Sequence, residues 1–274
     1  DIYLTQPTPT CSMGCMNEDY PRTLLELEER FSVESACRAY LYALRWPMGF
    51  LCPVCGASEA WAMDRGLWLC RGCRHQVSVM AGTIFQDTHL PLTTWFRAMW
   101  YVTSQKNGVS ALGLQRILGL GSYKTAWALL HKLRRAMVRP GRDRLRGIVE
   151  VTARSLHDFI ADAVEPRSTV RTDGLNAYLG LQSYEHDRPI QRDHGPKARL
   201  LPRVHQVISL LKRWLLGTHQ GAIGHDHLAY YLDEFTFRFN RRKSKSRGKL
   251  FYRLVQQAVQ VGPVPFESLT NHNP

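Results

Sequence analysis

CPVCGASEAWAMDRGLWLCRGC, residues 52–73, contains two CxxC pairs on either side of a segment that is able to form a β-hairpin. Two such turns at the ends of a hairpin bring four thiolates within tetrahedral reach of one Zn²⁺ ion. A redox dithiol would use one pair, so the pattern predicts a structural zinc site whose ligands are Cys52, Cys55, Cys70 and Cys73. In a module this small, the metal substitutes for the hydrophobic core that it lacks.

The composition of the 274-residue chain indicates globular domains with a polyanionic partner. Hydrophobic residues make up 44% of the sequence, which is enough for packed cores, and the length is typical of about two domains. The net charge of +13 fits nucleic acid, although ribosomal and membrane-surface proteins share such a bias. No stretch has the roughly 18 uncharged apolar residues of a membrane span, and the first residues lack the pattern of a secretory signal. We therefore expect a cytoplasmic protein, associated with the nucleoid, that has no membrane partner.

Changes in pattern along the chain predict an α+β protein of several parts. Helical spacing precedes and follows the cysteine block, and a Pro-Gly break inside a basic run marks a linker before strand-like segments. The predicted division is a loose N-terminus (1–20), short helices with the zinc ribbon (21–92), a helical region (93–137), the linker (138–147), an α/β domain (148–251) and a C-terminal tail (252–274).

A helix-turn-helix pattern lies in the helical region. Residues 111–118 form the expected first helix, 119–122 the turn and 123–137 the second helix, whose apolar side chains fall at core spacing. The basic side chains of the second helix fall largely elsewhere, as a DNA-facing helix requires: Lys124, His131, Lys132, Arg134 and Arg135. A plain helical hairpin with solvated basic residues is the alternative.

Two further groups of basic residues are candidate DNA contacts. Arg71 and Arg74 lie on the predicted ribbon, whose hairpin also carries Trp61 and Trp68. A basic arm follows the last predicted helix and begins with Arg241, Arg242 and Lys243. For the ribbon, the alternative is a solvated basic face over tryptophans that pack the module.

A strand, a helix and a second strand follow the linker as one βαβ unit. GIVEV (147–151) and STVRTD (168–173) are the two strand-like runs, and an amphipathic helix separates them. Asp173 therefore lies at the carboxyl end of a parallel strand, where such folds place functional residues. An acid before glycine is also ordinary turn chemistry. Downstream, His205 and Lys212 lie seven residues apart on a predicted helix, so they share one face.

From about Pro21 to Phe251 the chain resembles the zinc-ribbon DDE insertion-sequence transposases of the ISXO type. The resemblance rests on PRTLLELEERF, CPVCG, WLCRGCRHQVSVMAGTIFQDTHLPLTTWF, SALGLQRILGLGSYKTAW, TDGLNAYLGL, SLLKRWLLGTHQG and YLDEFTFRFNRR, which occur in the family's order. It implies a zinc ribbon, a helical DNA-binding segment and an RNase-H-like domain in which acidic residues hold two Mg²⁺ ions for strand cleavage and joining. The implied partners are transposon terminal inverted repeats, target DNA and further copies of the chain.

The resemblance also assigns residues of the nuclease domain. Asp173 matches the second catalytic aspartate, His205 falls at the third metal-site position, and Lys212 matches a lysine expected near the scissile phosphate. The first catalytic aspartate is missing, because Thr152 stands at its position and the strands that should follow it are absent. We therefore predict an internal deletion that truncates the RNase-H-like domain and leaves Asp173 to bind Mg²⁺ weakly. Three other acidic residues are poor replacements for the missing aspartate, because of their positions on the strand and the helix: Glu150, Asp158 and Asp162.

Three functions are consistent with these patterns. The first is a transposase by descent that binds DNA but is defective in cleavage, and the sequence favours it. The second is a non-catalytic DNA-binding protein that represses related transposases by occupying transposon ends. The third, a zinc-ribbon regulator or RNA binder unrelated to transposition, leaves the TDG and SLLKRWLLGTHQG motifs unexplained.

Overall fold

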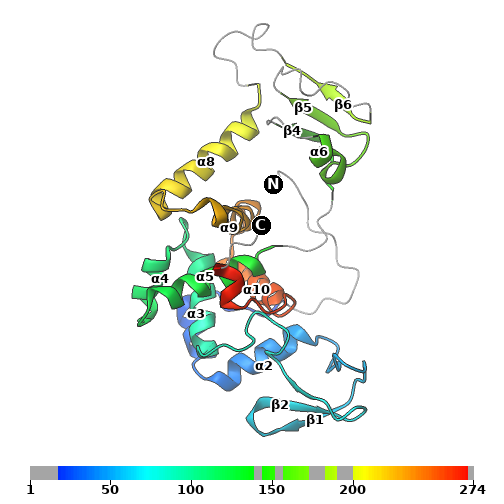
Figure 1. Ribbon diagram of the computed structural model, residues 1–274, viewed down its shortest axis with the longest axis vertical. Coiled ribbons are helices and arrows are strands. Elements are labelled where there is room, and N and C mark those ends of the chain that lie inside the picture. The colour runs from blue at the N-terminus through cyan, green and yellow to red at the C-terminus, as the bar shows by residue number, and fades with distance from the viewer. Residues whose placement is uncertain (1–17, 139–143, 152–156, 173–182, 190–199, 271–274) are drawn as a thin grey trace. The chain divides into compact units, whose positions relative to one another are not determined.

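The structure is a computed structural model that describes residues 18–138, 144–151, 157–172, 183–189 and 200–270 (Figure 1). The chain divides into two compact units. Among the described residues, the sheet unit lies between 144 and Ala222, and the helical unit comprises 18–138 and the residues from Ile223 to 270. The sheet unit is therefore inserted between two segments that fold together. Within the described ranges, no helix combines the length and the hydropathy required to cross a bilayer.

The helical unit begins with two short helices. α1 spans Leu24–Arg30 and α2 spans Glu34–Arg45. The hydroxyl of Thr23 accepts a hydrogen bond from the backbone N–H of Glu26 at 3.1 Å. The carboxylate of Glu26 in turn accepts one from the N–H of Arg22 at 2.6 Å. The first bond satisfies a backbone donor of the first helical turn, the second holds the residue before the cap, and together they define where α1 begins.

The ribbon is an antiparallel sheet of three short strands, β1 (Ala60–Met63), β2 (Leu67–Cys70) and β3 (Gln76–Ser78). One face packs on α2, where the rings of Trp68 and Tyr42 stack with their centroids 4.5 Å apart. Trp68 therefore packs the ribbon against α2.

α3 (Leu92–Ser104), α4 (Ala111–Leu118) and α5 (Tyr123–Ala136) follow the ribbon. The bounds of α4 and α5 confirm the predicted hairpin. α4 begins where the hydroxyl of Ser110 accepts the N–H of Gly113, and it ends at Gly119. Gly119 has a φ of 64°, a left-handed conformation that glycine adopts without a steric penalty, so the turn to α5 is set locally.

Helices from the end of the chain complete the helical unit: α9 (Leu228–Asn240), α10 (Arg247–Ala258) and the short α11 (Phe266–Thr270). α10 packs on α2, α3 and α5, and the ring centroids of Phe251 and Phe96 lie 5.7 Å apart. The structure therefore differs from the predicted division, which placed α9 in the α/β domain and the residues from 252 in a tail. Residues 252–258 continue α10 because this helix has an apolar stripe that packs against the core. The stripe is formed by Leu250, Phe251, Leu254 and Val255, which lie at helical spacing between basic residues.

Residues 18–20, predicted to end a loose N-terminus, form a strap against α10 together with Pro21. The carboxylate of Glu18 pairs with Lys249 at 2.7 Å and also with Arg253. The strap runs so close to α10 that a Cβ on Gly248 would lie 1.8 Å from the carbonyl oxygen of Pro21. Glycine is therefore required at this contact.

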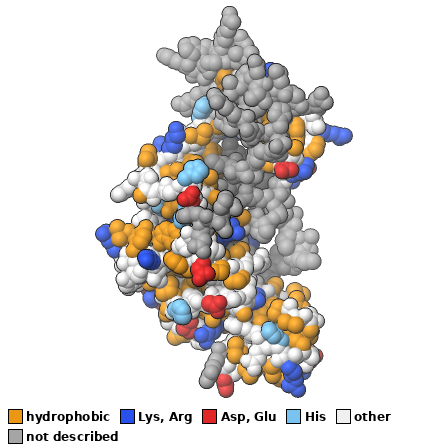
Figure 2. Space-filling model, in the orientation of Figure 1, with side chains coloured by type: hydrophobic (Ala, Val, Ile, Leu, Met, Phe, Trp, Pro, Cys, Tyr) orange, Lys and Arg blue, Asp and Glu red, His pale blue; other side chains and the backbone are white. Residues whose placement is uncertain are grey.

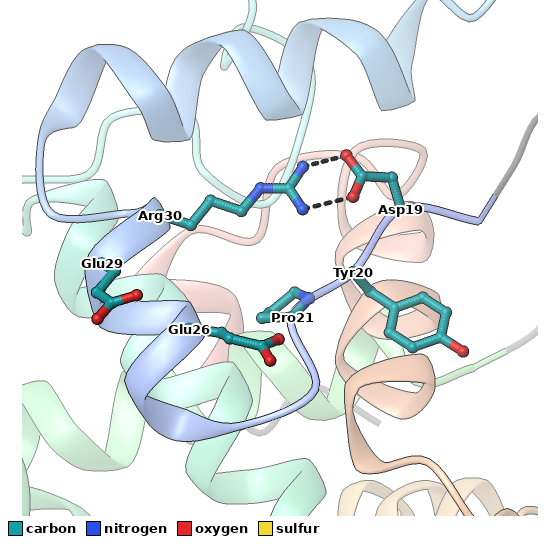
Figure 3. Close-up of a pocket in the computed structure, with 6 residues that line it drawn as sticks. All are labelled: Asp19, Tyr20, Pro21, Glu26, Glu29 and Arg30. Atoms are coloured by element: carbon teal, nitrogen blue, oxygen red, sulfur yellow. Dashed lines mark hydrogen bonds and ion pairs between the residues drawn. The ribbon is translucent and has the colours of Figure 1, made fainter.

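A shallow hollow of about 500 Å³ lies beside the strap and is lined by Asp19, Tyr20, Pro21, Glu26, Glu29 and Arg30 (Figure 3). Two nitrogens of the Arg30 guanidinium reach the two carboxylate oxygens of Asp19. Glu26 is already engaged in the cap of α1. The carboxylates of Asp19 and Glu26, which line the hollow, are therefore already engaged in holding the fold of this segment.

The sheet unit contains the predicted βαβ unit. β4 (Ile148–Val151) and β5 (Thr169–Thr172) pair in parallel, with α6 (His157–Ala163) between them in the chain. A third strand, β6 (Glu185–Asp187), pairs in parallel with β5, so β5 is central. α8 (Pro202–His219) follows. A small core formed by Val151, Ile160, Val164 and Val170 holds the unit together.

Candidate metal centre and nucleic-acid interface

The four predicted cysteines come together in the ribbon. Their sulfur atoms all lie within 4.8 Å of one another, with Cys52 Sγ 3.6 Å from Cys73 Sγ and Cys55 Sγ 3.5 Å from Cys70 Sγ. Tetrahedral zinc with Zn–S bonds of about 2.3 Å requires sulfur atoms about 3.8 Å apart, so the four thiols fit this ion. In the part of the chain that the structure describes, no other group of three or more ligating side chains is arranged for a metal.

Backbone hydrogen bonds shape both cysteine turns. The N–H of Gly56 donates to the carbonyl oxygen of Cys52 at 3.0 Å, and the N–H of Arg74 donates to the carbonyl oxygen of Cys70 at 3.1 Å. Gly56 and Arg74 have φ values of 73° and 61°, which close each turn. Hydrogen bonding from the backbone of Cys55 lowers the pKa of the Cys52 thiol to about 6. The turn thus favours the thiolate that a metal requires at Cys52. At Cys73 a hydrogen bond from the backbone of His75 lowers the thiol pKa, but burial and the neighbouring sulfur atoms of Cys55, Cys52 and Cys70 raise it to about 12.

The basic residues of α5 fall into two groups. Lys124 and Arg135 are exposed, and Lys132 is half-buried, where burial lowers the pKa of its ammonium group. These three side chains stay candidate DNA contacts. For His131 and Arg134 the prediction is wrong, because both side chains are buried inside the helical unit and do not reach solvent.

Arg134 instead forms a buried ion pair. Its Nε lies 2.9 Å from Oε2 of Glu234 on α9, and the two side chains are 2% and 0% exposed. The guanidinium also lies over the ring of Tyr231, 3.8 Å from its centroid, and Nη1 is 3.3 Å from Nε2 of His131. Glu234 Oε1 faces Arg238 at 3.9 Å. The network fixes α9 to the second helix of the hairpin.

Sequence reasoning missed this network because an arginine near the end of a helix is typical of a solvated surface. One signal was available. In YLDEFTFRF, residues 231–239, Glu234 lies at helical spacing with Tyr231 and Phe237 and directly before Phe235. A carboxylate within the apolar face of a helix requires a buried cation as a partner.

The basic arm belongs to the helical unit. Arg242 and Lys243 are exposed and Arg241 is half-buried. The guanidinium groups of Arg241 and Arg242 lie over the rings of Phe237 and Phe239, at 4.0 and 3.8 Å from the centroids. These contacts hold the start of the arm against the end of α9.

On the ribbon, Arg71 and Arg74 are both exposed. They lie beside Trp61, whose ring is on the face opposite Trp68. The ribbon, the hairpin and the arm therefore present exposed cations on a single compact unit.

Asp173 and Thr152 lie outside the described residues. The strands that precede them are described: β4 ends at Val151, β5 ends at Thr172, and these two residues are paired in register. The hydroxyl of Thr172 lies 3.0 Å from Nε2 of His186 on β6, a contact that the sequence did not predict.

His205 and Lys212 are exposed on α8. The start of this helix is fixed by Glu150 of β4, whose Oε2 accepts the backbone N–H groups of Arg203 at 2.9 Å and Val204 at 3.1 Å. The carboxylate thus caps α8, where a helix favours negative charge. Asp162 is exposed on α6, and the side chain of Asp158 lies outside the described part of the unit.

Comparison with known proteins supplies the family. The model of the transposase zinc-ribbon domain matches residues 32–76, and that of the ISXO2-like transposase domain matches residues 123–240. An uncharacterized protein in transposable element ISH50 of Halobacterium salinarum is 27% identical over 125 residues. That alignment covers 44% of this chain and 41% of the relative, less than half of either protein. No solved structure matches the chain. The chain therefore belongs to the insertion-sequence transposases that combine a zinc-ribbon domain with an ISXO2-like transposase domain.

Proposed function

We propose that this transposase-family protein binds DNA through its helical unit and is defective in cleaving it. The observation that carries the proposal is the placement of exposed cations on that unit: Arg71, Arg74, Lys124, Arg135, Arg242 and Lys243. A net charge of +13 supports a phosphate-rich partner, because each phosphate contact releases condensed counterions. The expected partners are terminal inverted repeats and target DNA, bound by more than one copy of the chain.

The ribbon would contribute to binding as a zinc-stapled module. The spacing of its four thiols fits tetrahedral zinc, and such a metal would hold β1–β3 in the shape that presents Arg71 and Arg74. Zinc has a structural role in this proposal, because four cysteines leave no open coordination position for a substrate.

The defect in cleavage follows from the residues around the carboxyl ends of β4 and β5. Two-metal chemistry requires carboxylates from neighbouring elements, yet the residue after Val151 is a threonine. Glu150 is engaged as the cap of α8. His205, on that helix, carries an imidazole, which is a poor ligand for Mg²⁺. With Asp173 as the one predicted carboxylate, these residues do not fit a pair of Mg²⁺ ions, and we derive no metal-dependent step from them.

DNA binding is tested by fluorescence anisotropy with a labelled duplex that carries the terminal repeat of a related element, over a series of salt concentrations. We expect Lys124→Gln and Arg135→Gln each to lower the slope of log affinity against log salt by about 1. Arg97→Gln is the matched control, since this exposed arginine of α3 faces Glu28 at 3.6 Å and is no candidate contact. Equal slopes in all four proteins would contradict the assignment.

Cleavage is tested by nicking of a supercoiled plasmid with Mg²⁺ or Mn²⁺. The expected result is no metal-dependent nicking above the level of Asp173→Ala. Metal-dependent nicking that Asp173→Ala abolishes would overturn the proposed defect. Thr152→Asp supplies the carboxylate that the sequence lacks, so it should strengthen Mn²⁺ binding measured by titration calorimetry, whereas Thr152→Asn should not.

A second candidate function is repression of related transposases. It is favoured by the helical unit, which has its own core and is completed by α9 and α10, independently of the sheet unit. Purified protein added to an active relative should then lower cleavage at shared ends, and the DNA-binding variants should lose this effect. Unchanged cleavage at saturating protein would exclude repression.

A further inference from the structure

We propose that Trp61 orients Arg71 and Arg74 as a clamp for the phosphate backbone of DNA. This inference rests on the proposed function, that the chain binds DNA, and identifies the contact that the ribbon makes. Trp61 is a positioning residue in this proposal, and the two guanidinium groups contact the phosphates.

Trp61 lies on the outer face of the ribbon sheet. It is paired with Leu69, and Met63 is paired with Leu67, so these side chains share the face opposite Trp68. Trp61 and Met63 are 40% and 39% exposed. The inner face is already packed on α2, so the exposed indole has no role in the core. Trp61 and Met63 thus form an exposed apolar pair beside cations, and tryptophan is enriched at contact surfaces.

Both arginines lie over the same indole. The guanidinium carbons of Arg71 and Arg74 are 5.0 and 4.9 Å from the centroid of Trp61, so they are at most about 10 Å apart. Arg71 Nη1 also donates to the Glu59 carboxylate at 2.8 Å. In the described residues Arg74 has no ion-pair partner. The ring therefore limits the positions of two side chains that would otherwise sample many rotamers, and this lowers the entropy cost of binding.

The chemistry of the pair fits phosphodiesters. A guanidinium presents a planar fork of donors that matches two phosphate oxygens. The Arg71–Glu59 pair is 50% and 69% exposed, and a pair so exposed contributes little, so a phosphate can displace the carboxylate. Figure 2 shows hydrophobic and basic side chains together at the surface over the ribbon, at the lower right of the view. Exposed cations elsewhere on the unit favour nucleic acid over an acidic protein.

The test uses the zinc-loaded full chain, with a labelled mixed-sequence duplex and one of its strands as probes, in anisotropy titrations at several salt concentrations. Trp61→Leu should weaken binding of both probes by about threefold to tenfold and leave the salt slope unchanged, because both cations remain. Arg71→Gln with Arg74→Gln should lower the slope by about 2. In that background Trp61→Leu should cause no further loss, since it acts through the arginines. Met63→Ala, on the same face, is the control and should bind as the wild type does.

Three results would overturn the clamp. A Trp61→Leu loss that persists without the arginines and is larger on the single strand would mean that the indole stacks on a base. A change of sedimentation coefficient in Trp61→Leu and Met63→Ala would mean that a second copy of the chain covers this face.

If the Arg71→Gln, Arg74→Gln double variant bound DNA with wild-type affinity while Arg135→Gln bound it more weakly, the clamp would be refuted and the proposed DNA binding would stand. Zinc content checks the fold of each variant, and Trp61→Phe, which keeps a ring, should lose less affinity than Trp61→Leu.

Discussion

Glu234→Leu should destabilise the helical unit more than any exposed substitution. The carboxylate is 0% exposed and lies 2.9 Å from Arg134 and 3.9 Å from Arg238, whose side chains are 2% and 13% exposed. Its removal leaves a buried guanidinium without its counter-charge. Such a loss costs about 3–5 kcal/mol, a large share of the roughly 5–15 kcal/mol that stabilises a domain.

The control is an ion pair of the same chemistry in water. Arg71 and Glu59 lie 2.8 Å apart, almost the distance of the buried pair, but are 50% and 69% exposed. Glu59→Gln should therefore cost less than about 1 kcal/mol. In thermal unfolding followed by circular dichroism, a cost of about 1 kcal/mol lowers the midpoint by about 2–4 °C in a unit of this size. Glu234→Leu should thus lower it by roughly 6–20 °C, with Glu59→Gln close to the wild type.

A double variant separates charge burial from packing. Arg134→Met with Glu234→Leu removes both charges and keeps most of the volume, so it should be more stable than Glu234→Leu alone. If the double variant were as unstable as the sum of the two single variants, the pair would not act as a unit. Equal midpoints for Glu234→Leu and Glu59→Gln would refute the burial argument itself.

Three further predictions concern the strap and the ribbon. Gly248→Ala should displace the strap, since the new Cβ would meet the Pro21 carbonyl at 1.8 Å, and should cost about 1–3 kcal/mol in denaturant unfolding. Hydrogen bonds and charge from Lys249 lower the pKa of Glu18, and those from Arg30 lower that of Asp19, from ordinary values of 4.5 and 3.8. A lowered folded pKa gives stability that is fully present above these ordinary values and is lost as the pH falls from them through the lower folded pKa, so amide protection in the strap, corrected for the intrinsic exchange rate, should fall below about pH 4, and Glu18→Gln should weaken this dependence. Chelation of zinc should remove amide protection from β1–β3 while α3 and α10 keep theirs, and loss of protection in all of them together would contradict a local staple.

Local signals predicted much of this fold. Cysteine spacing identified the thiol cluster, and the apolar periodicity with the turn at 119–122 placed both helices of the hairpin within one residue of their observed bounds. These features depend on neighbours within a few residues. The association of α9 and α10 with the N-terminal helices was not predictable in this way, because it depends on contacts such as Phe251 with Phe96, far apart in the chain. Burial of Arg134 escaped prediction for the same reason.

The position of the buried ion pair bears on how a transposase could lose part of its nuclease and still bind DNA. The match to the ISXO2-like domain runs from residue 123, in α5, to residue 240, in α9, so it begins and ends in the helical unit and includes the sheet unit between. Arg134 and Glu234 join those two ends across 100 residues of chain. The free-energy cost of closing such a loop changes by only about 0.6 kcal/mol when the loop length doubles. Breaking the buried ion pair costs about 3–5 kcal/mol. Loss of strands from the inserted unit would therefore leave the hairpin, α9 and the basic arm in place, which is the condition under which a cleavage-defective copy remains a DNA-binding protein.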